Sequence, residues 1–353
     1  MKTIAIFNNK GGVGKTTIAT MLGFMLASRN NRVLVIDLDP QSNTTQTVLD
    51  EQQIDRIYNP KTEAIRIKTI MDIIEPMRST NEPKIGDVKP TIYSSKKHGF
   101  KFDIIPSSLK LSIFEDTLSR AWDDVKGSQI GGFRRTNWAR QLFSQVEKRY
   151  DYVLIDLSPN LGALNRSVML NIDHFIIPTT GDIYNQYGVS NIGPWIKGWI
   201  KDYGRGVKFL SEDYSEDYLK TLNLNLDISE ENYIKLLGFI QNRVKFSERN
   251  KYKIITWQEK FFEKIALAIN NNLNFSFTDD IQKDLKLGTI KEVNSLLSES
   301  QNNTVPVVKR VYDAMQNEKK WGKRDVENAE YAVYQTFSDI LDNVMRNLEK
   351  VGN

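Results

Sequence analysis

The stretch IAIFNNKGGVGKTT, residues 4–17, joins a short apolar run to a glycine-rich loop and to the start of a helical pattern. Gly14, Lys15 and Thr16 match the second half of the general phosphate-binding pattern, which is Gly, any four residues, Gly, Lys and then Ser or Thr. The first glycine of that pattern falls on Asn9, a residue type that tolerates left-handed backbone angles better than most. We therefore expect a strand, a phosphate-binding turn and a helix N-terminus in this order.

The glycines of this loop suit an anion because they let successive backbone N–H groups point at one spot. Gly11, Gly12 and Gly14 provide this freedom, and the following helix presents the positive end of its dipole to the same place. Lys15 is expected to neutralise the β- and γ-phosphates, and the Thr16 hydroxyl to join the coordination sphere of Mg²⁺. The alternative, a glycine turn without a ligand, is disfavoured because the strand, the loop, the helix and the acids after the next strand all agree.

Apolar runs alternate with helical spacings along the first half of the chain, as they do in a parallel sheet built from βαβ units. We expect strands at residues 2–8, 31–39, 100–106, 150–159, 173–178 and 232–244. We expect helices at residues 16–28, 66–77, 107–122 and 135–149, the second of them ended by Pro76. The predicted fold class is an α/β P-loop NTPase, with a mostly parallel twisted sheet flanked by helices on both faces and with helical insertions.

The chain lacks a separate linker and internal repeats, so a single domain is expected over residues 1–353. Insertions are predicted at about 50–100 and 185–235; the second contains a helix around Pro194 and an acidic, polar stretch. Residues 126–133 are interpreted as a flexible connection, and roughly the last hundred residues as mostly helical.

The composition is that of a globular protein, with 40% hydrophobic and 26% charged residues. The absence of cysteine excludes disulfides and thiolate metal sites, and the two histidines, His98 and His174, lie far apart in sequence. The loop begins almost at the first residue and no apolar run could span a bilayer, so we expect a cytoplasmic protein without a signal peptide. The formal charge of +4 permits nucleic-acid binding without arguing for it.

The segment KGGVGKTT, residues 10–17, resembles the deviant Walker A loop of the ParA/MinD family of dimerising ATPases. In that family the early lysine, here Lys10, reaches across a dimer interface to the nucleotide held by the partner. The resemblance thus implies that Lys15 serves the nucleotide of its own subunit and Lys10 that of a second copy. It also implies that hydrolysis depends on dimerisation, because a cation supplied by the partner stabilises charge on the transferring phosphoryl group.

Two acidic segments extend the resemblance. VLVIDLDPQSN, residues 33–43, resembles switch I, which gives Asp39 the role of positioning the attacking water and Asp37 a place near the magnesium shell. YVLIDLSP, residues 152–159, resembles Walker B and switch II, which makes Asp156 the magnesium-holding acid, with Ser158 in place of the first of two prolines that are common there.

Asn242 follows a later strand, near a position where relatives place an adenine-reading asparagine; an asparagine that only terminates the strand is about equally expected. The predicted catalytic residues are Lys10, Lys15 and Asp39, and the predicted metal-binding residues are Thr16, Asp37 and Asp156. The predicted nucleotide-binding residues are Lys10, Gly11, Gly12, Val13, Gly14, Lys15, Thr16, Thr17 and Asn242, with ATP and Mg²⁺ as the cofactors.

The resemblance implies a homodimer formed on ATP binding, nonspecific DNA binding in partition or cargo positioning, and a partner protein that stimulates the ATPase. Basic clusters at residues 126–140, 242–253 and 319–324 fit DNA binding, although each alone is more simply a solvated face. The chain begins at the loop, so no helix-turn-helix reader domain is expected before it.

Sequence features favour or oppose three other roles. A membrane-surface role, as in the MinD branch, is disfavoured because the apolar stripe of the last helix suits packing on a core better than an anionic membrane. The alternative function is an ATPase scaffold or regulatory subunit for mobile-element maintenance or anti-phage defence. It would recruit an effector through the 185–235 insertion, where Trp195 and Trp199 could dock a protein or belong to the core. An iron–sulfur reductase is disfavoured by the lack of cysteine.

Overall fold

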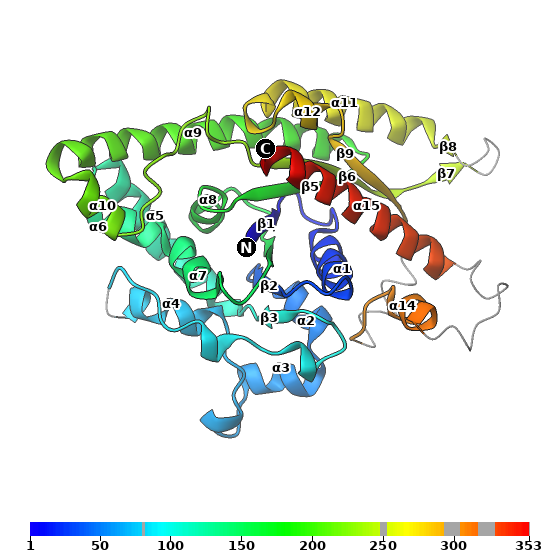
Figure 1. Ribbon diagram of the computed structural model, residues 1–353, viewed down its shortest axis with the longest axis horizontal. Helices are drawn as coiled ribbons and strands as arrows, with labels where there is room; N and C mark the ends of the chain where they lie inside the picture. Colours follow the sequence, from blue (N-terminus) through cyan, green and yellow to red (C-terminus); the bar gives the residue numbers. More distant parts are fainter. Residues whose placement is uncertain (80–81, 248–252, 293–303, 317–328, 353) are drawn as a thin grey trace.

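The computed structural model describes residues 1–79, 82–247, 253–292, 304–316 and 329–352. A seven-stranded sheet forms the centre of the molecule, in the order β3-β2-β4-β1-β5-β6-β9, and every neighbouring pair of its strands is parallel (Figure 1). Its strands are β1 (Lys2–Ile6), β2 (Val33–Leu38), β3 (Asp103–Ile105), β4 (Tyr152–Leu157), β5 (His174–Thr180), β6 (Leu236–Val244) and β9 (Lys286–Lys291). A separate antiparallel pair consists of β7 (Phe246–Ser247) and β8 (Lys253–Ile254).

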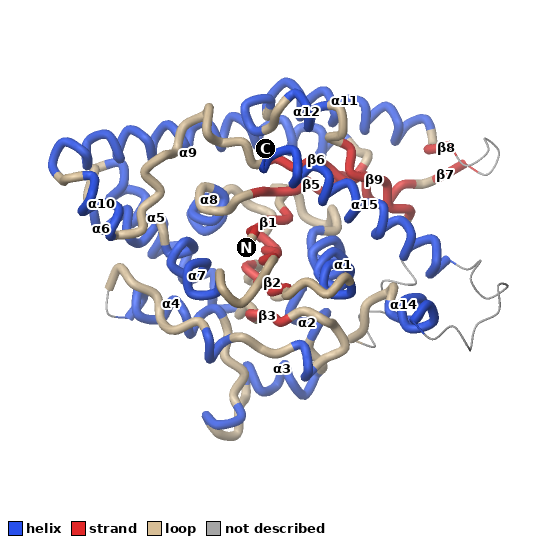
Figure 2. Tube along the Cα trace, viewed as in Figure 1, coloured by secondary structure: helices blue, strands red, loops and turns tan. Residues whose placement is uncertain are grey.

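Helices surround this sheet (Figure 2). In the first half of the chain they are α1 (Lys15–Ser28), α2 (Asn43–Val48), α3 (Glu51–Tyr58), α4 (Ile70–Ser79), α5 (Ser112–Lys126), α6 (Ile130–Thr136), α7 (Trp138–Val146) and α8 (Ala163–Met169). In the second half they are α9 (Ile183–Asp213), α10 (Glu216–Thr221), α11 (Thr256–Asn272), α12 (Asp279–Gln282), α14 (Lys309–Gln316) and α15 (Ala329–Gly352). Short 3₁₀ turns lie at Glu63–Ile65, Lys89–Thr91, Ser95–Lys97, Leu109–Leu111 and Asn274–Ser276.

The near-continuous apolar strands divide the core into two layers, because successive side chains of a strand point to opposite faces of the sheet. In β1, Ile4 and Ile6 join the core that α1 and α15 cover, whereas Ala5 belongs to the core beneath α5, α7, α8 and α9. The predicted fold class, a parallel sheet with helices on both faces, is therefore confirmed.

The structure corrects the expected end of the helix at Pro76. Helix α4 runs from Ile70 to Ser79, with Pro76 inside it. Proline removes one helical hydrogen bond, but Ile73 and Met77 are buried on the same face and hold the last turn against the core. Burial thus outweighs the local propensity here.

The prediction that roughly the last hundred residues are mostly helical missed strand β9 (Lys286–Lys291). This strand is six residues long and contains Gly288, so its sequence carries a weak strand signal. The glycine is required by packing, because a Cβ atom at this position would lie 2.4 Å from the side chain of Ile340 in α15. The expected flexible connection at 126–133 is also partly wrong, because α6 begins at Ile130 and packs closely on α5.

Helix α9 passes through Pro194 without a break and extends over 31 residues. Of its two tryptophans, Trp199 is buried and Trp195 is 47% exposed. The docking face that Trp195 and Trp199 could form is thus divided between surface and core.

The last helix, α15, buries Phe337, Leu341, Val344 and Leu348, which confirms that its apolar stripe packs on the core. Among the helices that the structure describes, none is long and apolar enough to cross a membrane.

Candidate functional site

The predicted site lies at the carboxyl edge of the sheet, where ligands of open α/β sheets bind. Strands β1, β2 and β4 are neighbours, and the glycine loop, the Asp37–Asp39 segment and Asp156 lie at their carboxyl ends. The topology therefore brings Asp156 next to two segments that lie more than a hundred residues before it in sequence.

The glycine loop obtains its shape from two left-handed residues, Gly12 with a φ of 73° and Gly14 with a φ of 91°. Asn9 is not among the described non-glycine residues with positive φ, so the turn forms without the left-handed conformation that Asn9 was expected to supply. Helix α1 begins directly after Gly14, and its first N–H groups therefore face the loop.

Asn242 contacts this loop from the end of β6. Its Nδ2 donates to the Val13 carbonyl at 2.8 Å, and a Cβ atom on Gly14 would lie 2.1 Å from the same nitrogen. Position 14 thus requires glycine for space as well as for backbone angle. Asn242 therefore lies at the candidate site, where its amide nitrogen binds the backbone of the glycine loop. Recognition of adenine by this residue stays a prediction.

Lys15 is buried, with a relative exposure of 7%. Within the described residues, the ammonium donates only to the carbonyl oxygens of Asn8 and Lys10, both at the long distance of 3.4 Å. Burial lowers the pKa of Lys15, while Asp156 and Asp39 act in the opposite direction. A phosphate would supply the short charge-assisted bonds that this cation lacks in the protein.

One carboxylate oxygen of Asp156 accepts from two hydroxyls, and the other has no hydrogen-bond partner in the described structure. Its Oδ2 accepts hydrogen bonds from the Thr16 and Thr44 hydroxyls, each at 2.7 Å. Its Oδ1 is buried without a hydrogen-bond partner in the described structure. Burial raises the pKa of this carboxyl group, which disfavours an unneutralised charge at this position.

This arrangement fits Mg²⁺, which proteins commonly hold through one or two carboxylates together with the phosphates of a substrate. The fit rests on the unpaired Oδ1 of Asp156 and on the adjacent Thr16 hydroxyl. Over the described ranges no cluster of three or more His, Cys, Asp or Glu side chains suits a metal. A divalent cation at Asp156 would therefore need oxygens from the nucleotide and water.

Asp37 is also at this edge, but protein donors occupy its oxygens. Oδ2 accepts from the Thr45 backbone N–H at 2.8 Å and the Thr45 hydroxyl at 2.7 Å, and Oδ1 accepts from the Asp39 N–H at 3.1 Å. Burial, and then repulsion by Asp156, raise the pKa of Asp37. The geometry gives Asp37 the task of shaping the segment after β2, and its predicted place near the metal stays a prediction.

Asp39 is buried. Its negative charge interacts with the Lys15 ammonium and acts to raise the pKa of that lysine. One oxygen accepts from the Gln41 N–H at 2.9 Å, and the Asp39 carbonyl accepts from the Ser107 hydroxyl at 2.7 Å. These bonds fix the loop that carries Asp39 to the end of β3, and so hold its carboxylate at the site.

Lys10 lies in an ion pair within its own subunit. Its ammonium contacts Asp182 Oδ2 at 2.6 Å, and the Thr180 hydroxyl donates to the same oxygen at 2.7 Å. Asp182 also caps α9 by accepting from the Asn185 N–H. The contact across a dimer that the resemblance implies for Lys10 would require this pair to open.

The segment after Asp156 forms a compact polar network. The Asn165 Nδ2 donates to the Ser158 and Asn160 carbonyls, each at 2.8 Å. The Ser158 hydroxyl accepts from the Asn160 amide at 2.9 Å, so the serine that replaces proline takes part in holding this turn. From α5, Glu115 accepts from the Ala163 and Leu164 N–H groups and caps α8.

Sequence reasoning missed four residues that organise the site: Thr44, Thr45, Asp182 and Asn8. The hydroxyls of Thr44 and Thr45 lie directly after the acids of residues 37–39, and that proximity was the available signal. Asn8 donates to the Asn185 Oδ1 at 2.9 Å, and both Asn185 and Asp182 lie about 170 residues downstream. A pairing at that separation leaves no local pattern.

A glycine loop between β1 and α1, with a buried lysine and a hydroxyl bound to the acid of a neighbouring strand, defines the class of P-loop nucleoside triphosphatases. Residues 1–209 match the family described as an AAA domain, AAA_31. The chain belongs to this family of ParA/MinD-type P-loop proteins.

Two relatives illustrate the match. An uncharacterized protein of Methanocaldococcus jannaschii is 32% identical over 71% of this chain and 76% of its own length. A protein of Chlamydia trachomatis named as a ParA family protein is 30% identical over 56% of this chain and 66% of its own length. The chain spans only 50% of the length of two uncharacterized relatives from Mycobacterium tuberculosis.

Solved structures agree with the fold. A Corynebacterium diphtheriae protein is 29% identical, covers 90% of this chain and 100% of its own, and has a TM-score of 0.68. A plasmid partition protein of Borrelia burgdorferi, solved with AMPPNP bound, is 20% identical, covers 98% of each chain and has a TM-score of 0.54. The second likeness is evidence for the fold alone.

Proposed function

We propose that this protein is an ATP-dependent molecular switch that hydrolyses ATP to ADP and phosphate and dimerises in the ATP-bound state. The observation that carries the proposal is the contact between Thr16 and Asp156, with the second oxygen of Asp156 buried and unpaired beside the loop. The ParA/MinD-type family, and the AMPPNP held by a protein of the same fold, support ATP as the nucleotide.

In this proposal each residue has a separate task. Lys15 and the N–H groups of the loop and α1 hold the phosphates. Thr16 and Asp156 hold Mg²⁺, which when bound would neutralise charge on the phosphate oxygens. Asp39 orients the attacking water, and Lys10 contributes its cation from a second copy once the pair with Asp182 has opened.

We expect ATP hydrolysis to require a divalent cation, because a carboxylate as buried as Asp156 would repel the triphosphate without one. The measurement is phosphate release with Mg²⁺, and with excess chelator in its place. Chelation is expected to remove at least about 99% of the activity, and restored Mg²⁺ to return it, since loss of one such electrostatic group costs about 10²-fold or more. Hydrolysis that persists under chelation would contradict the assignment of Asp156 and Thr16.

A finer part of the proposal is that the ATP-bound dimer binds duplex DNA without sequence preference, as in DNA partition or cargo positioning. The basis is the family together with the basic clusters. The cluster at 126–140 is partly neutralised, because Arg135 lies 3.4 Å from Asp124 and Lys126 lies 3.8 Å from Asp123. Residues 248–252 of the second cluster, and the whole cluster at 319–324, lie outside the described residues.

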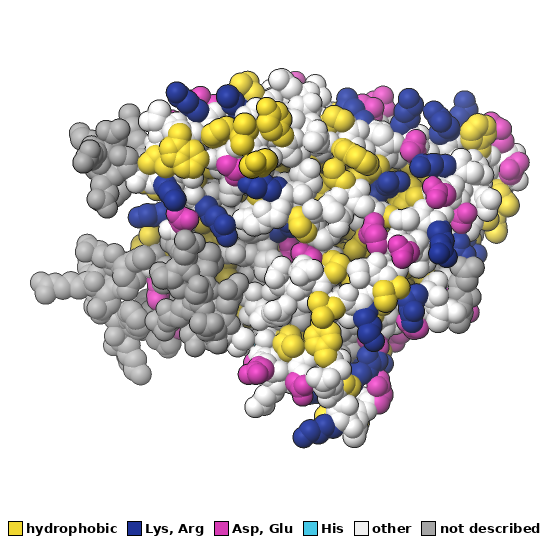
Figure 3. Space-filling model, turned by 180° about the vertical axis from the view of Figure 1, so that it is seen from behind, with side chains coloured by type: hydrophobic (Ala, Val, Ile, Leu, Met, Phe, Trp, Pro, Cys, Tyr) yellow, Lys and Arg dark blue, Asp and Glu magenta, His cyan; other side chains and the backbone are white. Residues whose placement is uncertain are grey.

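Positive charge is not concentrated over the face in Figure 3, where lysine and arginine side chains alternate with acidic ones. Residues 242–253 contribute Arg243, Lys245, Arg249, Lys251 and Lys253 to the proposed contact with DNA. A dimer would present two copies of this segment and raise the local positive potential.

Filter binding with scrambled duplex DNA measures whether the ATP-bound dimer binds DNA without sequence preference. Retention is expected with an ATP analogue and not with ADP, and a dimer that neutralises ~6 phosphates would give a log–log salt slope near −5. Charge reversal at Arg249, Lys251 and Lys253 should flatten the slope. The matched control reverses three exposed lysines elsewhere, Lys61, Lys148 and Lys208. Negligible retention in ATP analogue and ADP at two ionic strengths would remove DNA and favour a scaffold that recruits a protein effector.

A further inference from the structure

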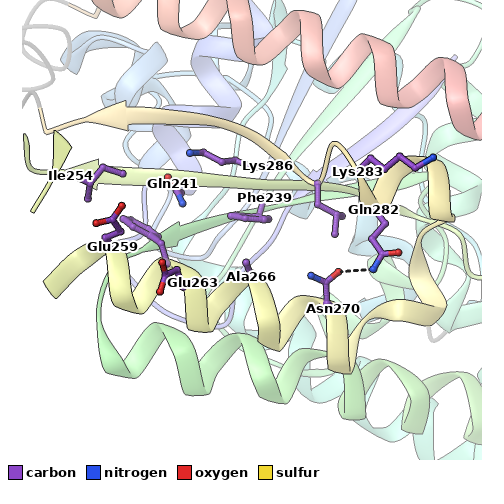
Figure 4. A pocket seen from close by; sticks show the side chains of 12 residues that line it. Phe239, Gln241, Ile254, Glu259, Glu263, Ala266, Asn270, Gln282, Lys283 and Lys286 are labelled. Atoms are coloured by element: carbon purple, nitrogen blue, oxygen red, sulfur yellow. Dashed lines mark hydrogen bonds between the residues drawn. The ribbon is translucent and has the colours of Figure 1, made fainter. Parts of the chain in front are cut away.

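A cleft of about 390 Å³ lies between α11 and the strands β6 and β9, away from the glycine loop (Figure 4). Its apolar base is formed by Phe239 on β6, Phe262 on α11 and Leu285 before β9, all of which are buried. At one end, the Gln282 Nε2 donates to the Asn270 Oδ1 at 3.5 Å and closes the cleft. The candidate nucleotide site uses none of these residues.

One buried polar side chain points into this cleft with a free donor. Gln241 is 7% exposed and lines the cleft from β6. Its Oε1 accepts from the Thr289 hydroxyl at 2.9 Å, whereas its Nε2 donates to none of the residues that the structure describes. In Figure 4 the amide points from the strand toward α11. This N–H₂ group keeps its access to solvent through the cleft, where an acceptor on a ligand could replace water as its hydrogen-bond partner.

The opposite wall carries two unpaired carboxylates. Glu259 and Glu263 are one turn apart on α11, line the cleft and are exposed (Figure 4). Neither forms an ion pair with a residue in the described part of the chain, although adjacent like charges on a helix destabilise it. A cation between them would relieve that repulsion.

Two lysines lie on the side of β9. Lys283 is already 3.6 Å from Asp280, and burial lowers the pKa of Lys286. The cleft therefore has an acidic wall on α11 and a basic rim on the other side. The two glutamates attract a positive group to the α11 side of the cleft, and the lysines repel it from the β9 side.

We propose that this cleft binds an arginine or lysine residue within an extended segment of a partner protein. The cationic group lies between Glu259 and Glu263, the aliphatic part of the side chain packs on Phe239 and Phe262, and a main-chain carbonyl accepts from Gln241. The occupant is assigned from charge complementarity and from the unused donor. The inference does not depend on the proposed function.

The cleft adjoins the segment that holds Lys10. A Cβ atom on Gly181 would lie 3.0 Å from the Phe262 ring and 3.1 Å from the Gln258 side chain, so α11 packs directly on residue 181. The next residue, Asp182, makes the ion pair with Lys10. A partner in the cleft would thus contact a helix that supports the loop's own ion pair.

Titration by ligand-observed NMR of the full chain tests the proposal with three small probes. The first is N-acetyl-arginine N-methylamide, a one-residue model of a basic peptide. The second is the citrulline analogue, which has a similar shape and no charge. The third is agmatine, which keeps the cation but lacks the peptide carbonyl. A fragment of this size is expected to bind with a Kd of roughly 1 mM.

The arginine probe should bind at least about tenfold more tightly than the citrulline analogue, since bonds to charged groups are the stronger ones. The double variant Glu259→Gln/Glu263→Gln should bind the arginine probe at least about tenfold more weakly than the parent protein does. The control Glu147→Gln, at an exposed glutamate after α7, should bind it with the parental affinity. Gln241→Met should weaken the arginine probe and leave agmatine unaffected, with unchanged circular dichroism as the check on folding.

Equal binding of the arginine and citrulline probes, or binding of the arginine probe that survives the double glutamate variant, would overturn the proposal. Absence of binding by the arginine probe at 10-fold above its expected Kd, roughly 10 mM, would also overturn it. Agmatine binding as tightly as the arginine probe would exclude the peptide carbonyl and indicate a polyamine site instead. All of these outcomes are independent of whether the protein hydrolyses ATP.

Discussion

Lys15→Ala is expected to lower the affinity for ATP by about 10²-fold or more, because the phosphates lose their main side-chain cation. The structure supports an effect of this size: the ammonium is buried, and its contacts to the Asn8 and Lys10 carbonyls are long at 3.4 Å. These weak contacts lose little when the side chain is removed, so folding should survive. Calorimetric titration with a non-hydrolysable ATP analogue and Mg²⁺ measures the change.

The matched control for this variant is Lys148→Ala, an exposed lysine after α7. It should bind the analogue as the parent does. Parental affinity in Lys15→Ala, with the fold intact by circular dichroism, would show that Lys15 does not contact the phosphates and that the loop has another purpose.

Asp39→Ala is expected to keep nucleotide binding and to slow turnover by about 10²-fold or more, the usual scale for one catalytic group. The side chain is 6% exposed and makes only one hydrogen bond that the structure records, from the Gln41 N–H. The Ser107 bond goes to the Asp39 backbone and is kept in the variant. The loss should therefore fall on chemistry and spare both binding and fold.

Single-turnover hydrolysis, together with analogue affinity, separates these two effects. Asp116→Ala, which removes an exposed acid of α5, serves as the control and should retain the parental rate. Hydrolysis by Asp39→Ala at the parental rate would transfer the role of positioning the water to another group at the site.

The part of the fold that local patterns determine was predicted well. The loop and the start of α1 lie within residues 4–17, so glycine spacing, apolar strand and helix start can be interpreted together. The same holds for β2 and β4, whose apolar runs end in acids. Strand β9 was missed because Gly288 weakens its pattern and its place depends on α15, about fifty residues further along.

The partners of the site residues were less accessible to prediction. Nothing near Lys10 in sequence indicates Asp182, because the sheet order β4-β1-β5 brings the ends of β1 and β5 together. The resemblance gives Asp37 a place near the magnesium shell, which stays a prediction, whereas nothing in the sequence indicates that the hydroxyl and N–H of Thr45 bind one of its oxygens. Hydrogen bonding of this kind depends on how the chain turns after a strand.

The central claim is that ATP binding at this loop converts the protein to a dimer, and light scattering with size-exclusion chromatography measures it directly. With Mg²⁺ and a non-hydrolysable ATP analogue, the mass should be twice that of the 40.7 kDa chain, and with ADP it should be that of one chain. Lys10→Ala should remain a monomer in both states while still binding the analogue. A parental protein that binds the analogue tightly and keeps the mass of one chain would contradict the account.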